Sequence, residues 1–537
     1  MRKLPLGIQN FRKIREGNYV YVDKTEYIYD LINNASYYFL SRPRRFGKSL
    51  LIDTIEETFS GERELFKGLF IYNSDYDFEK HPVLRLDMSR MSNKSPEALE
   101  NSLASYLKKR VKEESLDIDD ELPSDILQYL IEGLHDKYGK RVVILIDEYD
   151  KPILDHMDDI DVAEANRKVL RGFYGILKPM DSHIRLAFIT GVSKFTKTSI
   201  FSELNNLYDI TMTERYSSIC GIAIEEMDMY FGEHIKYLAS LEAFERYDNL
   251  QDEILAWYDG YSWDGKSRVI NPFSLLSFLM QRRFAGFWYA SGTPDFFIKL
   301  IKQKPSSFLS LNDLEISERA LDNFDIRKMN ISPLLFQTGY LTVDSTRFRG
   351  DSLSYLLKMP NLEVREAFYL NIIAEFTETG DDFAESAYWR IKESLETGDL
   401  NGMLGVLKSL FASIPYELHV KREAYYHSIF YAVLNLLGFD VKAEVSVSGG
   451  RVDAVLELDD KVYIMEFKYR DCETPPLGIR DVYLKAKQEL YTEALNEGLA
   501  QIKDRGYSRK YGGSGKTIYQ VAFVFLGRDD IEMLFEI

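Results

Sequence analysis

The stretch YYFLSRPRRFGKSLL, residues 37–51, decides the fold of the first part of the chain. The apolar run 37–41 predicts a buried strand. GKS at 47–49 has the form of the last three positions of a phosphate-binding loop that opens a helix. Arg42 stands where the first glycine of such a loop belongs. Two interpretations are therefore open at this point: a nucleotide site, or a basic turn that contains GKS.

The order strand, loop and helix supplies what a phosphate site requires. Backbone N–H groups at a helix N-terminus point toward an anion. Lys48 is placed to reach the outer phosphates, and Ser49 supplies a hydroxyl for Mg²⁺. The loop itself, Arg42 to Ser49, gives the candidate nucleotide-binding residues Arg42, Arg44, Arg45, Phe46, Gly47, Lys48 and Ser49.

A second signal lies about 100 residues further on, in RVVILIDEYD, residues 141–150. An apolar strand that ends in two carboxylates places Asp147 at the magnesium shell and Glu148 where it can orient a water for attack on the terminal phosphate. A buried strand with an acidic turn is the plain alternative. The combination with GKS favours ATP binding. In FITGVSKF, Thr190 or Ser193 is expected to sense the γ-phosphate or to cap a helix.

Alternating elements predict an α/β fold for the first part of the chain. Strand-like runs at 37–41, 82–89, 141–150, 184–191 and 208–213 alternate with segments of helical periodicity. This pattern is typical of a mostly parallel sheet covered on both faces. We expect an AAA-like P-loop domain over residues 1–220.

The rest of the chain divides into four further predicted regions. A helical, aromatic-rich lid region covers 221–320, a helix with a two-stranded hairpin suits a winged-helix-like module at 321–365, and a helical connector covers 366–420. For the winged-helix-like module we favour packing over DNA binding, because it has no basic recognition helix. Residues 421–537 return to an α/β pattern, with a last strand predicted at 518–526.

Composition limits the location and partners that we expect. The sequence of 537 residues has no apolar run of about 18 residues and no apolar signal core at its start, so we expect a cytoplasmic protein without a membrane span. Its two cysteines, Cys220 and Cys472, offer no disulfide framework. The net charge of −18 argues against binding nucleic acid through the overall field. A local patch near the C-terminus is either basic binding surface or a solvated helix end: Lys503, Arg505, Arg509, Lys510 and Lys516.

The segment RVDAVLELDDKVYIMEFKYR, residues 451–470, carries the second concentration of chemistry. If residues 459–460 form a two-residue turn, Asp453 lies directly opposite Glu466, and facing like charges destabilise a hairpin unless a cation lies between them. Because side chains alternate along a strand, Lys468 lies on the same face of the sheet as Glu466. These groups suit a Mg²⁺ or Mn²⁺ site for phosphodiester hydrolysis, with Lys468 orienting the nucleophile. An exposed hairpin of alternating charges is the alternative.

A preceding helix offers further ligands for that metal. Glu423 could complete the metal shell, and His427 lies four residues on, hence on the same helical face.

The motifs of the first 300 residues together resemble a known family. YVDKTEYI, RPRRFGKS, LIDEYDKP, GVSKF and WYDGYSWDG with NPFSLLSF look like the AAA-ATPase-like proteins of bacteria, in which RPRRFGK[ST] is the usual loop. The resemblance implies ATP binding by residues 42–49, with Asp147 and Glu148 as acidic partners. In that family Arg42 is the expected residue. Arg44 and Arg45 would stabilise phosphate charge or serve in packing or salt bridges.

Residues 420–537 resemble the PD-(D/E)XK nuclease module that follows the ATPase in the same family. The resemblance rests on YHSIFYAVLNLLGF, GGRVDAVLE, VYIMEFKY and EGLAQIKDRGY. It implies a restriction-endonuclease-like α/β fold with Asp453, Glu466 and Lys468 as the catalytic core. Glu423 and Gln501 are weaker candidates. Val452 stands where the family name has proline.

These expectations combine into one functional hypothesis. An ATP-binding, ATPase-like domain would license metal-dependent cleavage of DNA or RNA by the second domain. The alternative is a nucleotide-switched signalling or scaffold protein whose nuclease-like domain binds without cutting. Rings are common among AAA proteins, but the sequence offers no convincing arginine finger, so the oligomeric state stays open.

Overall fold

The computed structural model describes most of the chain as two compact units. The described residues are 1–537 without 118–119, 195–199, 202–203, 205, 289–313, 323–330, 378–380, 414–431, 434, 437–439, 445–450, 471–479, 505–510, 512 and 527–529. Unit 1 consists of Met1–Phe296 and Asn312–Val364, and unit 2 consists of Phe297–Leu311 and Arg365–Ile537.

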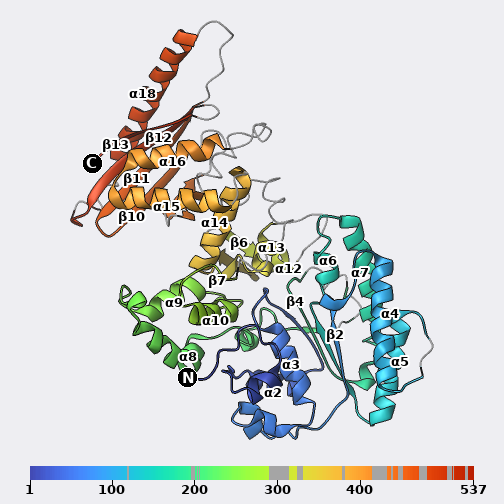
Figure 1. The fold of residues 1–537 in the computed structure, drawn as a ribbon. Helices are drawn as coiled ribbons and strands as arrows, with labels where there is room; N and C mark the ends of the chain where they lie inside the picture. The colour runs from blue at the N-terminus through green and yellow to red at the C-terminus, as the bar shows by residue number, and fades with distance from the viewer. Residues whose placement is uncertain are drawn as a thin grey trace. The chain divides into compact units, whose positions relative to one another are not determined.

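The centre of unit 1 is a parallel five-stranded sheet, as the sequence predicts (Figure 1). Its order is β2-β3-β4-β1-β5, and every pairing within it is parallel. The strands are β1 (Tyr37–Ser41), β2 (Val83–Asp87), β3 (Val142–Asp147), β4 (Ile184–Gly191) and β5 (Tyr208–Asp209). The strand expected at 208–213 forms only over its first two residues. Because parallel strands end at the same edge, the segments that follow β1, β3 and β4 meet there.

Helices of unit 1 cover this sheet. Helix α3 (Lys48–Thr58) follows the β1 loop and contacts β3 and β4. Helices α4 (Pro96–Glu113), α5 (Pro123–Tyr138) and α7 (Ile160–Gly175) pack against one another beside the sheet (Figure 1). Shorter helices α1 (Phe11–Glu16), α2 (Thr25–Asn34) and α6 (Lys151–Leu154) complete this region. Strands β1 and β3 are buried along their whole length, which explains their continuous apolar sequences.

The middle of the chain is helical, as expected. Helices α8 (Ile224–Ala239), α9 (Leu250–Tyr258) and α10 (Pro272–Gln281) share a core rich in phenylalanine and leucine. The start of α10 is encoded locally: Pro272 occupies its first turn, and the Asn271 side chain accepts hydrogen bonds from the backbone N–H groups of Phe273 and Ser274.

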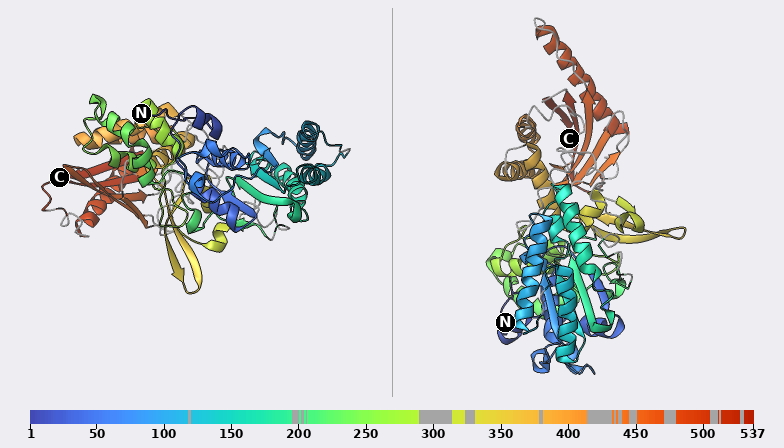
Figure 2. Two further views of the ribbon diagram at one scale, coloured as in Figure 1. Left: turned by 90° about the horizontal axis from the view of Figure 1, so that it is seen from below. Right: turned by 90° about the vertical axis from the view of Figure 1, so that its right-hand side faces the viewer.

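A small three-stranded sheet follows in unit 1. It has the order β6-β8-β7 and consists of β6 (Leu314–Ser317), β7 (Thr342–Arg349) and β8 (Ser352–Lys358), accompanied by α12 (Glu318–Asp322) and α13 (Ile331–Thr338). The sequence predicts α13 and the hairpin but misses β6. Both views of Figure 2 show the β7–β8 hairpin projecting from its unit. Since α13 buries Leu334 and Leu335, the packing role favoured for this module is physically reasonable.

Unit 2 contains helices and a mixed five-stranded sheet. Helices α14 (Leu362–Thr377), α15 (Asp381–Thr397) and α16 (Leu400–Ala412) precede it, and α14 begins at the end of unit 1. The sheet order is β13-β12-β11-β10-β9, formed by β9 (Asp440–Glu444), β10 (Arg451–Glu457), β11 (Lys461–Arg470), β12 (Thr517–Leu526) and β13 (Asp530–Glu536). Only β11 and β12 are parallel, and α18 (Arg480–Asp504) packs on both.

The prediction that 518–526 is the last strand is wrong. Strand β13 follows and pairs antiparallel with β12. Its sequence, DIEMLFE, places acidic residues among apolar ones, and charged residues are common on edge strands, where they discourage pairing with another chain.

Candidate nucleotide site and candidate nuclease site

The β1–α3 loop has the backbone geometry of a tight anion-binding turn. Gly47 caps α3 in the left-handed region, with φ of +89°, which favours glycine. Arg45 also has a positive φ, +70°. The first N–H groups of α3 therefore face the end of the loop, where a helix N-terminus favours negative charge.

Arg42 is built into the support of this loop. Its side chain is fully buried, and its guanidinium donates hydrogen bonds to the carbonyls of Thr211 (2.9 Å) and Tyr216 (3.2 Å). It also stacks on Trp263, 3.8 Å from the ring centroid. Burial lowers the pKa of Arg42 to about 10, so it remains charged near neutrality. These contacts favour a loop-shaping role for Arg42 over a contact with phosphate.

The loop residues after Arg42 differ in exposure: Arg44 and Arg45 are exposed, and Lys48 is buried. Arg44 and Arg45 line a polar cavity of about 430 Å³, together with Gly47, Lys48 and Ser49. The Lys48 ammonium donates to the carbonyls of Arg42 and Pro43, at 2.9 Å each. These bonds fix its side chain across the loop. Of the predicted loop residues, Arg42 and Phe46 do not line this cavity.

The residue that follows β3 faces the same cavity, whereas Asp147 at the end of the strand is buried and does not line it. Glu148 lines it with φ of +51°, and its backbone N–H donates to the Asp147 carboxylate at 3.0 Å. Burial and the neighbouring Asp147 charge raise the pKa of Glu148. Burial lowers the pKa of Lys48, and the charges of Asp147 and Asp150 oppose that shift. A carboxylate whose pKa is raised toward neutrality suits a general base.

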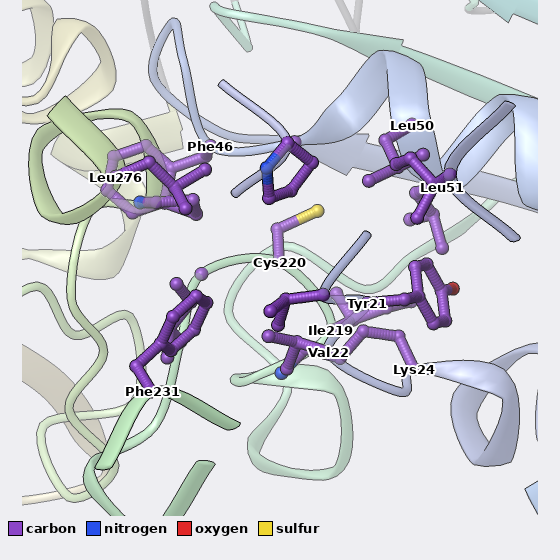
Figure 3. Close-up of a pocket in the computed structure, with 17 residues that line it drawn as sticks. Tyr21, Val22, Lys24, Phe46, Leu50, Leu51, Ile219, Cys220, Phe231 and Leu276 are labelled. Carbon is purple, nitrogen blue, oxygen red and sulfur yellow. The ribbon is translucent and has the colours of Figure 1, made fainter. Parts of the chain in front are cut away.

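An apolar cavity of about 100 Å³ adjoins the polar one (Figure 3). In Figure 3, Phe46, Leu276 and Phe231 lie around one side of it, and Tyr21 and Leu51 lie on the other. The two cavities share five lining residues from three distant segments: Pro5, Gly47, Leu50, Pro272 and Leu276. Sequence reasoning missed this cavity, because its walls come from positions 5 to 276.

The hydroxyls of Thr190 and Ser193 are used inside the protein. Thr190 donates to the carbonyl of Leu40 at 2.8 Å, and Ser193 donates to the Asp150 carboxylate at 2.6 Å. Asp150 also accepts from the backbone N–H of Val192. Asp150, the last residue of DEYD, therefore anchors the loop after β4, a role that the sequence did not reveal. Neither hydroxyl lines the polar cavity.

In unit 2 the hairpin register is as predicted. Asp453 pairs directly with Glu466, and the backbone N–H of Leu458 donates to the carbonyl of Lys461 around the turn at 459–460. In this register, Asp453 on β10 lies opposite Glu466 on the neighbouring strand β11. The position of the Asp453 side chain lies outside what the structure describes, as do Glu423 and His427.

Lys468 is the centre of a polar cluster in which Lys468 and Glu466 are buried and Glu497 is exposed. Its ammonium lies 3.6 Å from a Glu466 oxygen and 3.3 Å from a Glu497 oxygen, and it donates to the Gln501 side-chain carbonyl. Glu466 and Lys468 are only 2% and 6% exposed, so this cluster is not the solvated hairpin of the alternative interpretation. Glu497 was missed by the sequence reasoning. The spacing of Glu497 and Gln501, four residues apart on α18, places both on one helical face and was an available signal.

The donors of each candidate metal site are hard oxygens, which Mg²⁺ prefers. Ser49 and Asp147 lie at the ends of neighbouring elements in unit 1, and Asp453 and Glu466 are paired in unit 2. In the described part of the chain, no group of three or more His, Cys, Asp or Glu residues is arranged to hold a metal. Mg²⁺ usually keeps several waters and takes one or two carboxylates with phosphate oxygens, so two protein ligands per site fit this ion.

The predicted basic patch near the C-terminus is partly neutralised. Lys503 pairs with Glu536 at 2.6 Å, and Lys516 pairs with Glu457 at 2.9 Å. Arg505, Arg509 and Lys510 lie outside the described residues. Buried Cys220 is a free thiol, Cys472 is also outside the described residues, and none of the described helices has the length and apolarity to cross a membrane.

Comparisons with known proteins match a family to each of the two parts of the chain. Residues 5–201 match the family described as "Predicted AAA-ATPase", and residues 421–533 match the family described as "PD-(D/E)XK nuclease superfamily". The chain is also 36% identical over 540 residues to the uncharacterized protein in the vnfD 5′ region of Azotobacter chroococcum mcd 1, covering 98% of this chain and 96% of that protein. The chain therefore belongs to the family of AAA-ATPase-like proteins that carry a C-terminal PD-(D/E)XK nuclease superfamily domain.

Proposed function

We propose that unit 1 binds ATP with Mg²⁺ across the two adjoining cavities. The observation that carries this proposal is their difference in chemistry: basic groups, a hydroxyl and a carboxylate gather in one cavity beside apolar residues, apolar side chains line most of the other, and Gly47 borders both. A triphosphate matches the first and a purine ring matches the second. Gly47 has no side chain to obstruct the sugar between them.

Each loop residue then has a definite role in the proposal. Lys48, Arg44 and Arg45 neutralise phosphate charge, while Ser49 and Asp147 hold Mg²⁺, which would neutralise charge developing on the phosphates. Phe46 is buried and closes the base cavity. Glu148, with its raised pKa, takes a proton from the attacking water. Arg42 holds the loop in shape.

A comparison of nucleotides tests the base cavity. Its only basic side chain, Lys24, donates to both carboxylate oxygens of Glu226 and to the Ser218 carbonyl. Guanine would therefore bury its extra polar groups without partners, at a cost of affinity. We expect Mg-ATP to bind at least about tenfold more tightly than Mg-GTP. Val22→Phe, which fills the cavity, should weaken ATP binding. Met229→Phe, at an exposed position of α8, should not. Equal affinity for both nucleotides would contradict the assignment.

We also propose that unit 2 hydrolyses phosphodiester bonds of nucleic acid, DNA or RNA. Asp453 and Glu466 would hold Mg²⁺ or Mn²⁺, which would polarise the scissile phosphate and activate a water. Lys468 is held by Glu497 and Gln501 with its ammonium beside Glu466, where it can orient the water or stabilise developing charge. The polar cluster around Lys468 supports this proposal.

Cleavage of DNA and RNA substrates with Mg²⁺ or Mn²⁺ tests the second proposal. Wild type should cut at least one of them, and Asp453→Ala and Lys468→Ala should not. Lys485→Ala, at an exposed position of α18 outside the predicted basic patch, should retain activity. Absence of metal-dependent cutting under every nucleotide condition would favour the scaffold alternative. If Lys48→Ala abolishes ATP binding but leaves cleavage unchanged, the two sites are not coupled.

A further inference from the structure

The phosphate loop is attached to a residue far along the chain. The indole Nε1 of Trp288 donates a hydrogen bond to the Arg44 carbonyl at 3.2 Å. The Trp288 ring is almost fully buried and meets Tyr340 edge-on, with 5.2 Å between centroids. The loop side of this contact is Arg44, whose side chain lines the polar cavity. A change in the position of the Arg44 peptide therefore acts directly on Trp288.

Trp288 is itself attached to a buried carboxylate. Its backbone N–H donates to one oxygen of Glu363 at 2.7 Å, and the Ser274 hydroxyl donates to the other oxygen at 2.7 Å. Glu363 is fully buried, and burial raises its pKa to about 7. Ser274 follows Pro272 and Phe273, which line the polar cavity. Burying a carboxyl group is costly unless it is hydrogen-bonded, and here each oxygen of Glu363 has a donor.

Glu363 lies in the first turn of α14, and that turn has a second attachment. The Asn361 side chain accepts from the backbone N–H of Val364 at 3.1 Å and donates to the Asp259 carbonyl at 2.9 Å. Gly260 has a φ of +108°, and a Cβ there would lie 2.2 Å from the Pro360 carbonyl oxygen. The start of α14 is thus in close contact with the 259–260 turn.

The 259–260 turn leads directly into the aromatic support of the loop. Tyr261 and Trp263 pack edge-on against Phe46, at 4.7 Å and 5.5 Å between centroids, and Trp263 also stacks on Arg42. Both routes, one through Trp288 and one through the 259–263 segment, join the phosphate loop to the first turn of α14.

We propose that Trp288 and Glu363 are positioning residues of the nucleotide site, which join the Arg44 carbonyl of the phosphate loop to the first turn of α14. Phosphate bound by the loop fixes the Arg44 peptide, and the two hydrogen bonds of Trp288 carry that constraint to Glu363. Helix α14 continues into unit 2 after Val364, so its first turn is on the covalent path between the two domains. The inference rests on the proposed binding of ATP.

Two substitutions test the connection from its two ends. Trp288→Phe keeps a buried aromatic ring but removes the indole donor. Glu363→Leu removes both acceptors, whereas Glu363→Gln keeps an acceptor for Trp288. The readouts are the Kd for Mg-ATP and the hydrogen exchange of backbone amides 361–364 with and without Mg-ATP, measured on the full chain. Trp389→Phe, at a half-exposed position of α15, is the matched control.

The expected results separate positioning from packing. Loss of one hydrogen bond should weaken ATP binding about fivefold in Trp288→Phe and at least as much in Glu363→Leu. In both variants ATP should slow exchange at amides 361–364 less than in the wild type, because only the route through the 259–263 segment remains. Glu363→Gln and Trp389→Phe should behave as wild type in both readouts.

Three outcomes would overturn the inference. The first is a folded Trp288→Phe that has wild-type affinity for ATP and wild-type ATP-dependent protection. The second is a Glu363→Leu variant that behaves as wild type in both readouts. The third is a loss of protection in Glu363→Gln as complete as in Glu363→Leu. If Trp288→Phe does not fold, the comparison of Glu363→Leu with Glu363→Gln still tests the inference. Failure of the wild type to bind ATP is a different result, which overturns the proposed function and this inference with it.

Discussion

Glu363→Gln should stabilise unit 1 at neutral and alkaline pH. The side chain of Glu363 is fully buried, its two oxygens accept hydrogen bonds from Ser274 and Trp288, and Gln has the same shape. The phenol of Tyr261 lies near enough to interact with the carboxylate, but it is uncharged over the range concerned. Gln would keep the bond from Trp288, and its amide N–H could donate to the Ser274 hydroxyl.

The magnitude follows from the raised pKa. In the folded chain the pKa of Glu363 is about 7, against an ordinary value of 4.5, because burial disfavours the charged form. The folded state therefore keeps the proton up to about pH 7, while the unfolded state releases it near pH 4.5. Wild type loses stability as pH rises between these values. At about 1.4 kcal/mol for each tenfold change in the ionisation constant, the loss is about 3 kcal/mol.

Urea unfolding of wild type and Glu363→Gln from pH 5 to pH 8 measures this effect. Tryptophan fluorescence reports mainly on unit 1, because Trp257, Trp263 and Trp288 belong to it and only Trp389 belongs to unit 2. The advantage of the variant in the free energy of unfolding should rise from about 1 kcal/mol at pH 5 to about 3 kcal/mol at pH 8. If the difference in free energy of unfolding between the variant and wild type does not change with pH, or falls as pH rises, the pKa of Glu363 is not raised in the folded chain.

Three other predictions follow from contacts of the two sites. Arg42→Lys should lower the free energy of unfolding by about 2 kcal/mol and with it the urea midpoint, because an ammonium lacks the planar guanidinium that reaches several carbonyls and stacks on indole. Unchanged stability with lost ATP binding would instead indicate that Arg42 contacts phosphate. Gly339→Ala should weaken ATP binding more than about tenfold, because φ there is +94° and a Cβ would lie 2.8 Å from Pro43 of the loop. Gly350→Ala has a positive φ but no neighbour within 4 Å and should leave affinity unchanged. Glu497→Ala should slow metal-dependent cleavage about tenfold without changing substrate affinity, because Lys468 loses a partner that orients its ammonium. Cleavage at the wild-type rate would show that Glu497 does not orient Lys468.

Local patterns made part of this structure predictable. The pairing of Asp453 with Glu466 follows from counting residues back from a two-residue turn, since a hairpin fixes its own register. The phosphate loop and the acidic end of β3 are also encoded in short segments. A parallel sheet then brings them together, because its strands end at one edge.

The remaining features depend on contacts that no local pattern contains. The base cavity is built from segments between Pro5 and Leu276, so no short motif describes it. The partners of Arg42 are distant backbone carbonyls and an indole ring, which no local motif specifies, so the sequence left both a phosphate contact and a loop-shaping role open. Glu497 was overlooked because its role arises only where α18 packs over β11.

Equilibrium binding of Mg-ATP to the full chain tests the central claim most directly, namely that the 42–49 loop and its two cavities form an ATP site. We predict one ATP bound per chain in the wild type and an affinity at least about a hundredfold weaker in Lys48→Ala, whose lost ammonium would face the phosphates. Equal binding by wild type and Lys48→Ala, or no binding by the folded wild type, would contradict the claim.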